Sequence, residues 1–247
     1  MHPTHARYLL TLPRRQGLLT ALFLLLAVSL SAQIRNHRNS YNYLDFADNP
    51  YYFGITLGGN SSDYDLEYSS DFALNDSIAV ATSSRGPGLN LGIVTNLKLG
   101  QYFDLRLLPT LTFVERRLQF TNPNTLEAEQ QSIEATFVEL PFHVRYKSSP
   151  YKDMRMFVVA GVKYGFDVAS NSRNRQEPGL VRVSPTDFSI EYGVGVQFFF
   201  PFFIFSPEFK VSHGLNNVLI YDEDNPQSSV LDRVLSRSFT LAFHFEG

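Results

Sequence analysis

Residues Met154 to Val168 read MRMFVVAGVKYGFDV, and for fifteen consecutive positions they alternate between two kinds of side chain. At about 3.3 Å per residue the stretch extends roughly 50 Å, whereas a typical globular strand spans ~17–20 Å. A tilted strand crosses a membrane in ~9–11 residues, so this one can cross and still project beyond the bilayer. The stretch therefore predicts one strand of a transmembrane β-barrel. Its apolar face consists of Met154, Met156, Val158, Ala160, Val162, Tyr164, Phe166 and Val168.

The opposite face of this strand, and of several others, is rich in glycine. Glycine weakens an exposed strand but makes room where side chains from opposite walls share a narrow interior. We therefore place the glycine face in the lumen and the apolar face against lipid. The alternative is a soluble barrel with its apolar face inside. The glycines concerned are Gly54, Gly58, Gly88, Gly92, Gly161, Gly165, Gly193 and Gly195.

Period-two series elsewhere in the chain predict an all-β fold, an eight-stranded antiparallel transmembrane β-barrel. The connections alternate between long and short, which is typical of outer-membrane barrels with long extracellular loops, short periplasmic turns and periplasmic termini. The predicted strands are 51–64, 87–99, 101–118, 132–147, 153–169, 186–199, 202–213 and 235–246. The long connections are 65–86, 119–131, 170–185 and 214–234.

The N-terminal region predicts export. Residues 1–32 combine basic residues with the apolar run Leu18 to Leu30 and small residues up to Ala32, the pattern of a secretory signal peptide. We expect residues 33–50 to form a periplasmic arm and 51–247 to form the barrel. The chain has no cysteine, which excludes a lipoprotein anchor and thiolate chemistry. These features predict the cell outer membrane as the location and its lipid as a partner.

Composition also limits the functional classes. A net charge of −3 with dispersed basic residues gives no field that would attract nucleic acid. No phosphate-binding loop or metal-ligand cluster is evident, so we predict no cofactor and no metal.

The charged residues on the lumen face suggest a filled interior. Acids and bases are nearly matched, and an eight-stranded barrel is just wide enough for side chains to fill. Buried charges persist only when they are paired, so we expect a salt-bridged lumen without an open pore. The predicted network is Asp104, Arg106, Glu139, Arg145, Arg155, Lys163, Asp167, Glu191, Glu208 and Lys210.

The last predicted strand alternates aromatic and apolar residues with small polar ones and ends close to Gly247. Outer-membrane barrels end similarly on an amphipathic strand, so we expect the barrel-insertion machinery to recognise this segment. An ordinary closing strand is the compatible simpler interpretation. The proposed insertion signal is Phe239, Leu241, Phe243 and Phe245.

Enzymatic activity is the weakest of the hypotheses. An acyltransferase-like barrel would need a histidine, an acid and a hydroxyl near the outer rim. His143 and His244 lie toward the periplasmic half, and only His213, next to Ser212, approaches the outer end of its strand. A lone inward histidine more often fills the lumen, so we predict that the protein is not an enzyme.

Three segments resemble the PorT family of outer-membrane β-barrels. They are NPYYFGITLGGN at Asn49–Asn60, ELPFHVRYKS at Glu139–Ser148, and the stretch from Arg155 to Asp167 with its Gly161. The resemblance implies a role in type IX protein secretion and the linked gliding motility, as a barrel required for export without being the channel. It implies other secretion components as partners and brings no catalytic residues.

The segment ahead of the first strand, Arg35 to Asp48, is too poor in apolar residues to form a domain, yet it contains aromatic residues. It is either a periplasmic arm that contacts a secretion partner or a disordered leader. The main rival function is a surface adhesion or binding barrel that acts through its extracellular loops. Ser61 to Ser84, with five acids and no base, is the most prominent of these loops.

Overall fold

The computed structural model describes residues 41–69, 80–121, 128–168, 182–221 and 231–247. The predicted signal peptide and residues 33–40 of the predicted arm lie outside these ranges. The elements are α2 (Tyr43–Ala47), β1 (Tyr51–Tyr68), β2 (Val80–Lys98), β3 (Phe103–Leu107), β4 (Thr110–Thr121), β5 (Ala128–Lys147), β6 (Met154–Asp167), β7 (Arg182–Val183), β8 (Thr186–Phe199), β9 (Ile204–Gly214), β10 (Leu219–Ile220) and β11 (Leu231–Glu246).

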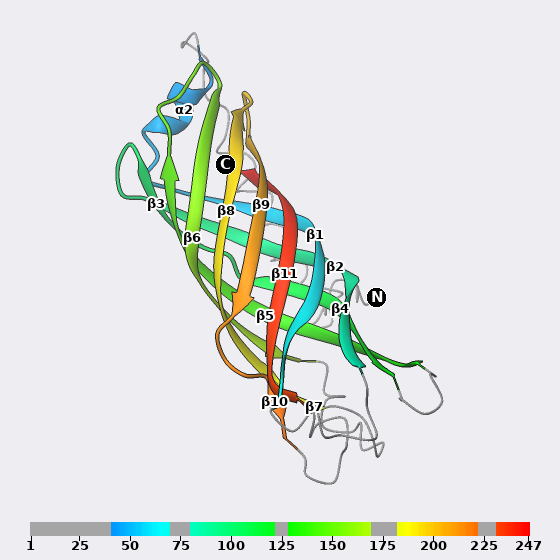
Figure 1. Ribbon diagram of the computed structural model, residues 1–247. Helices are drawn as coiled ribbons and strands as arrows, with labels where there is room; N and C mark the ends of the chain where they lie inside the picture. Colours follow the sequence, from blue (N-terminus) through cyan, green and yellow to red (C-terminus); the bar gives the residue numbers. More distant parts are fainter. Residues whose placement is uncertain (1–40, 70–79, 122–127, 169–181, 222–230) are drawn as a thin grey trace, which may run out of the picture. The chain divides into compact units, whose positions relative to one another are not determined.

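The large sheet closes on itself as an antiparallel barrel (Figure 1). β1 pairs with β2 on one side and with β11 on the other, so the first and last strands seal the ring. β3 and β4 together make one wall segment, because each of them pairs with both β2 and β5. Counting β3 and β4 as one interrupted strand, the ring has eight strands, and the predicted fold class is confirmed.

One predicted strand is interrupted. The strand expected over 101–118 breaks at Leu108 and Pro109, which separate β3 from β4. Proline has no N–H to donate to a ladder and commonly marks such an irregularity. The backbone still bonds across the break, since Leu108 N donates to the Pro141 carbonyl at 3.1 Å and Ile93 N to the Pro109 carbonyl at 3.0 Å.

Several strands reach further outward than their apolar pattern predicts. β2 begins at Val80 rather than at residue 87, and β5 begins at Ala128 rather than at residue 132. The ladders continue to Val80–Thr121 between β2 and β4, and to Thr121–Ala128 between β4 and β5. Beyond the bilayer both faces of a strand meet water, so the alternation fades while the backbone pairing persists.

Side chains alternate between an exposed apolar surface and a filled lumen. On β6, Met156 and Val158 are exposed, while their neighbours Arg155, Phe157 and Val159 are buried. The predicted insertion-signal residues face outward on β11, where the ring of Phe243 stacks on Phe205 and that of Phe245 packs against Phe203 and Phe205. Among the described residues, no helix is long and apolar enough to cross a bilayer.

Glycine makes room in the lumen at the position where the charges are densest. A Cβ atom built on Gly161 would lie 2.0 Å from the Phe142 carbonyl oxygen and 2.8 Å from the His143 ring. By contrast, a Cβ on Gly59, which is exposed, would come no closer than 4.0 Å to another atom. The His143 ring therefore occupies space that only a glycine on the neighbouring strand leaves free.

Candidate functional site

The periplasmic half of the lumen contains a buried ion triad. Arg106 on β3 donates from Nη1 to Oε2 of Glu208 and from Nη2 to Oε1 of Glu246, at 2.7 Å in both cases. All three side chains are 0% exposed. Glu208 and Glu246 belong to β9 and β11, on the opposite part of the ring from β3. The Arg106 guanidinium therefore links β3 to β9 and β11 across the lumen.

A second buried cluster lies beside this triad. Asp104 accepts hydrogen bonds from Nε and Nη2 of Arg145, at 3.1 and 2.6 Å, and from Lys147 Nζ. Arg145 also bonds to the Tyr52 hydroxyl and, at 3.1 Å, to Oδ1 of Asn96. Each of these side chains is buried. The cluster links β1, β2, β3 and β5 at the periplasmic end.

The middle of the lumen is a chain of alternating acids and bases. His143 Nε2 lies 2.8 Å from Oε2 of Glu191, and Lys163 Nζ lies 3.3 Å from Oε1 of the same residue. Lys163 also pairs with Glu139 at 2.9 Å. Lys210 reaches Glu191 at 3.6 Å. Four strands, β5, β6, β8 and β9, are joined by these contacts.

Neutral polar residues continue the network toward the first strands. Thr112 Oγ1 donates to Oε2 of Glu139 at 2.8 Å and accepts from Nδ2 of Asn90 at 3.1 Å. Asn60 Nδ2 donates to Oδ1 of Asn90 at 2.5 Å. The network therefore runs around much of the inner wall without a gap in hydrogen bonding between β5 and β1.

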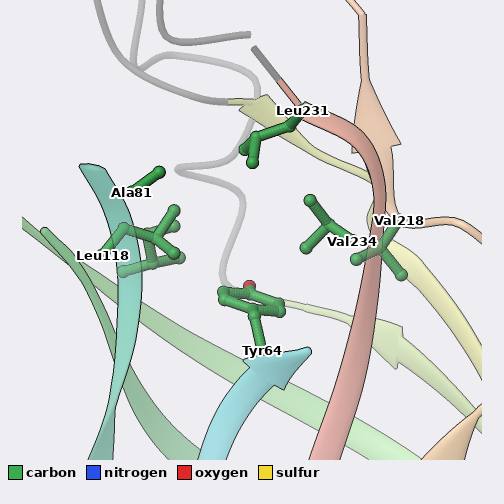
Figure 2. Close-up of a cluster of buried hydrophobic side chains, with 7 residues drawn as sticks. Tyr64, Ala81, Leu118, Val218, Leu231 and Val234 are labelled. Carbon is green, nitrogen blue, oxygen red and sulfur yellow. The ribbon is translucent and has the colours of Figure 1, made fainter. Parts of the chain in front are cut away.

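At the outer end of the lumen the buried side chains form an apolar cluster instead of ion pairs. Figure 2 shows Tyr64, Leu118, Leu231 and Val234 pointing toward one another. The guanidinium of Arg116 lies over the Tyr64 ring, 4.8 Å from its centroid, at the boundary with the charged part. We call this cluster the outer plug; its buried members are Tyr64, Ala81, Leu118, Ile133, Val218, Leu231 and Val234.

Two short strands from the extracellular connections pack on the outer plug. β7 and β10 form a small antiparallel sheet in which Leu219 pairs with Val183. Val218 N donates to the Val234 carbonyl at 3.0 Å, and Ser184 N donates to the Val218 carbonyl at 2.7 Å. Leu219 and Val183 also pack on the outer plug. We call this two-stranded element the outer lid; it was not predicted from the sequence.

At the opposite end of the barrel from β7 and β10, helix α2 lies against the periplasmic mouth (Figure 1). The rings of Tyr43 and Phe46 pack on Phe199, with centroids 5.3 and 6.0 Å apart. The Arg155 guanidinium lies 4.8 Å from the Tyr43 ring centroid. Lys98 Nζ donates to the backbone carbonyls of Phe46 and Ala47. This part of the predicted arm is therefore an ordered cap.

The outer part of the wall carries a charged triad just above the apolar belt. Asp63 on β1 accepts two hydrogen bonds of 2.9 Å from Arg237 and one of 3.2 Å from Arg85. The Arg85 guanidinium covers Phe239 at 4.5 Å. Burial opposes ionisation of Asp63, but the two arginines outweigh it and hold the pKa of this carboxyl below its usual value. The triad marks the outer limit of the lipid-facing surface.

Most of the predicted network residues lie in the lumen, with two differences. Arg155 is buried but contacts Tyr43 of α2 and makes no described ion pair, and Asp167 is only half-buried near the outer end of β6. Lys147 and Glu246 belong to the network although they were not predicted, and the unpredicted Arg116 is buried beside Tyr64. The position of Glu246 could have been predicted from its strand, because Glu246 continues the inward-facing series Ala242 and His244.

The histidine and serine considered for catalysis do not come together. Ser212 is buried in the lumen, whereas His213 faces outward and stacks on the Tyr192 ring, with centroids 5.8 Å apart. His143 and His244 are fully buried among carboxylates. Among the described residues, no group of three or more side chains could hold a metal ion.

A closed antiparallel barrel with an apolar outer surface and a charged lumen defines the class of outer-membrane β-barrel proteins. A family model described as outer membrane protein beta-barrel domain matches residues 31–219. The chain belongs to this family and resides in the outer membrane. Its placement in the narrower PorT group stays a prediction. Among curated proteins, no sequence matches the chain.

Solved structures of outer-membrane proteins are similar to the chain. OprG from Pseudomonas aeruginosa is 12% identical with a TM-score of 0.44, covering 79% of this chain and 96% of OprG. Ail, the attachment invasion locus protein of Yersinia pestis, is 14% identical with a TM-score of 0.36, and the match covers 81% of this chain and 100% of Ail. The N-terminal β-barrel domain of Pseudomonas aeruginosa OprF is 10% identical with a TM-score of 0.31, covering 78% and 97%.

Proposed function

We propose that this barrel is a non-enzymatic accessory of protein secretion by a type IX-like system, and that it acts without an open pore. The observation that carries the proposal is closure of the lumen at three levels. Ion pairs centred on Arg106 and Glu191 fill the interior, the outer plug closes the extracellular end, and α2 covers the periplasmic mouth. A barrel closed in this way can hold and position partners but offers no path for cargo.

The periplasmic end is the surface that the secretion hypothesis favours. The cap α2 contacts Phe199 with Tyr43 and Phe46, while Leu44 on the helix and Tyr41 just ahead of it stay exposed. Exposed apolar side chains on a fixed helix are suited to a protein contact. Residues of the arm are therefore held at a defined place from which a periplasmic secretion component can bind.

The first test is the secreted proteome of a clean deletion strain that carries plasmid copies of the gene. We expect cargo proteins to disappear from the medium and accumulate in the periplasm, and the wild-type copy to restore them. A Leu44→Ser copy should restore secretion poorly, because it removes an exposed contact residue. Phe202→Ser, which changes an exposed aromatic in the β8–β9 turn, serves as a control on the same side of the membrane.

Unchanged secretion in the deletion strain would refute the secretion role. Conductance steps of a few tenths of a nanosiemens in planar bilayers would refute the closed lumen separately. Because the first result concerns partners and the second concerns the barrel interior, the two parts of the proposal fail independently.

Adhesion through the extracellular surface is the second candidate, and the outer lid supports it. β7 and β10 pair with each other and pack on the outer plug, so the described part of this end presents a preformed surface. Asn217 anchors the lid, because its Oδ1 accepts from the backbone N–H groups of Leu219 and Val234, at 3.0 Å in both cases. An Asn217→Ala copy should therefore impair surface binding in the adhesion case and leave secretion unchanged in the secretion case.

A further inference from the structure

An apolar groove crosses the outer surface of the barrel over β6, β8, β9 and β11. Its volume is about 440 Å³, within the ~300–1,000 Å³ of typical ligand pockets. Nearly all of its lining is apolar, and its walls include Met156, Val158, Val194, Val196, Phe209 and Leu241. All of these side chains belong to the face that the strand pattern assigns to lipid.

The groove exists because the wall is thin at one seam. Pairing between β8 and β9 is described at Gly195–Glu208 and again at Phe198–Phe205, but not at the two positions between. Pro207 lies in this interval and has no N–H to offer the neighbouring strand. Gly195 adds no side chain, and the ring of Phe157 behind it would lie 2.3 Å from a Cβ. The lining at this seam therefore consists of Gly195, Pro207 and two lumen residues, Phe157 and Glu208.

The position of the groove identifies what fills it. Its walls are highly exposed, with Met156 at 61% and Val194 at 56%, and they continue the apolar belt on both sides. One end lies at Tyr146 and Ser148, next to the short periplasmic turn between β5 and β6. In a membrane such a surface contacts hydrocarbon, and this end of the groove faces the periplasmic leaflet.

We propose that the groove binds one acyl chain of a phospholipid from the periplasmic leaflet. A smooth barrel wall gives lipid chains no reason to prefer one position over another. Here a chain can lie in a recess between Val158 and Phe209, where it gains contacts on its floor and both sides. Such packing contacts are individually small but add up over a whole chain. The site is independent of the secretion role proposed above.

The test uses the full mature chain in vesicles of phosphatidylethanolamine that contain a fraction of the same lipid with a diazirine in mid-chain. After illumination, we expect labelled peptides to come mainly from residues 154–158, 194–196 and 207–209. Val158→Phe fills the groove and should lower this labelling several-fold. Val162→Phe, four residues further on the same face of β6, lies outside the groove lining and should leave it unchanged.

Labelling spread evenly around the apolar belt would overturn the proposal, as would equal losses in the two variants. Both variants are first checked for the folded barrel by their mobility on SDS gels before and after heating. If Val158→Phe does not fold, Val196→Phe fills the same groove from β8 and replaces it.

Discussion

Removing the guanidinium of Arg106 should destabilise the barrel more than any surface change of the same kind. Breaking a buried pair by removing one partner costs ~3–5 kcal/mol. Here Glu208 keeps His244 at 3.5 Å and Lys210 at 3.9 Å, and Glu246 keeps Arg145 at 3.7 Å. These remaining partners place the expected loss for Arg106→Met at the lower end, about 3 kcal/mol.

The chain has no tryptophan, so unfolding is followed by far-UV circular dichroism and by gel mobility rather than by indole fluorescence. With a urea dependence of ~1–3 kcal/mol per M, the loss corresponds to a midpoint ~1–3 M lower in lipid vesicles. The matched control is Arg117→Met, whose pair with Glu115 is solvent-accessible and should contribute little to stability.

A charge-free triad provides the second half of this test. Arg106→Met combined with Glu208→Gln and Glu246→Gln removes all three charges of the triad, while Lys210 keeps Glu191 at 3.6 Å and Arg145 keeps Asp104 at 2.6 Å. Replacing a complete buried ion cluster is often close to neutral. The triple variant should therefore recover much of the stability lost in the single variant. Equal urea midpoints for wild type, Arg106→Met and Arg117→Met would refute the view that the lumen ion pairs stabilise the barrel.

Three further predictions concern the wall, the outer rim and the lumen. Gly161→Ala should lower the stability of the barrel by ~1–3 kcal/mol, because the new Cβ collides with Phe142 and His143. The control Gly59→Ala, on the open outer surface, should match wild type in the same urea titration. Equal effects of the two variants would contradict a steric role for Gly161. Asp63→Asn should cost ~0.2–1 kcal/mol at neutral pH. The pKa of Asp63 is lowered in the folded protein, so the extra stability of the wild type over Asp63→Asn is present above the usual carboxyl range and is lost as pH falls through the folded pKa. The urea midpoints of the two proteins should therefore converge in acid. A difference that stays constant with pH would count against the ion triad. Finally, purified wild-type protein should give no conductance steps in planar bilayers, and steps that appear only after Tyr64→Ala would identify the outer plug as the seal.

The sequence predicted the barrel well because two independent patterns agree. Strand periodicity separates lipid from lumen, and the long and short connections set the number of strands and their direction. Where one pattern fails, the prediction fails too. Val80 to Gly86 carries polar residues on both faces, so the outward extension of β2 was missed, and the two residues of β7 are too few to show a period.

The lumen was harder to predict in detail than the wall. The alternation of inward and outward residues along a strand assigns Arg106 and Glu208 to the interior, but it does not say which charged side chains pair across the lumen. That depends on the stagger of strands far apart in the sequence, such as β3 and β11. Arg155 also lies on the inward face of its strand, yet it contacts Tyr43, because along the barrel axis it lies at the height of α2 and not at that of the ion pairs.

The arrangement of apolar and charged residues follows from the solvent outside the barrel. In a soluble protein, Phe and Leu gain free energy by leaving water for a protein core, whereas on this barrel they gain it by leaving water for lipid. One register is favoured over another because it places the apolar face against lipid and the charged face in the lumen. A shift of β3 by one residue against its neighbours would turn Arg106 into the membrane and break both of its ion pairs, with Glu208 and Glu246. The charged lumen and the apolar outer face therefore specify together how the strands of the barrel align.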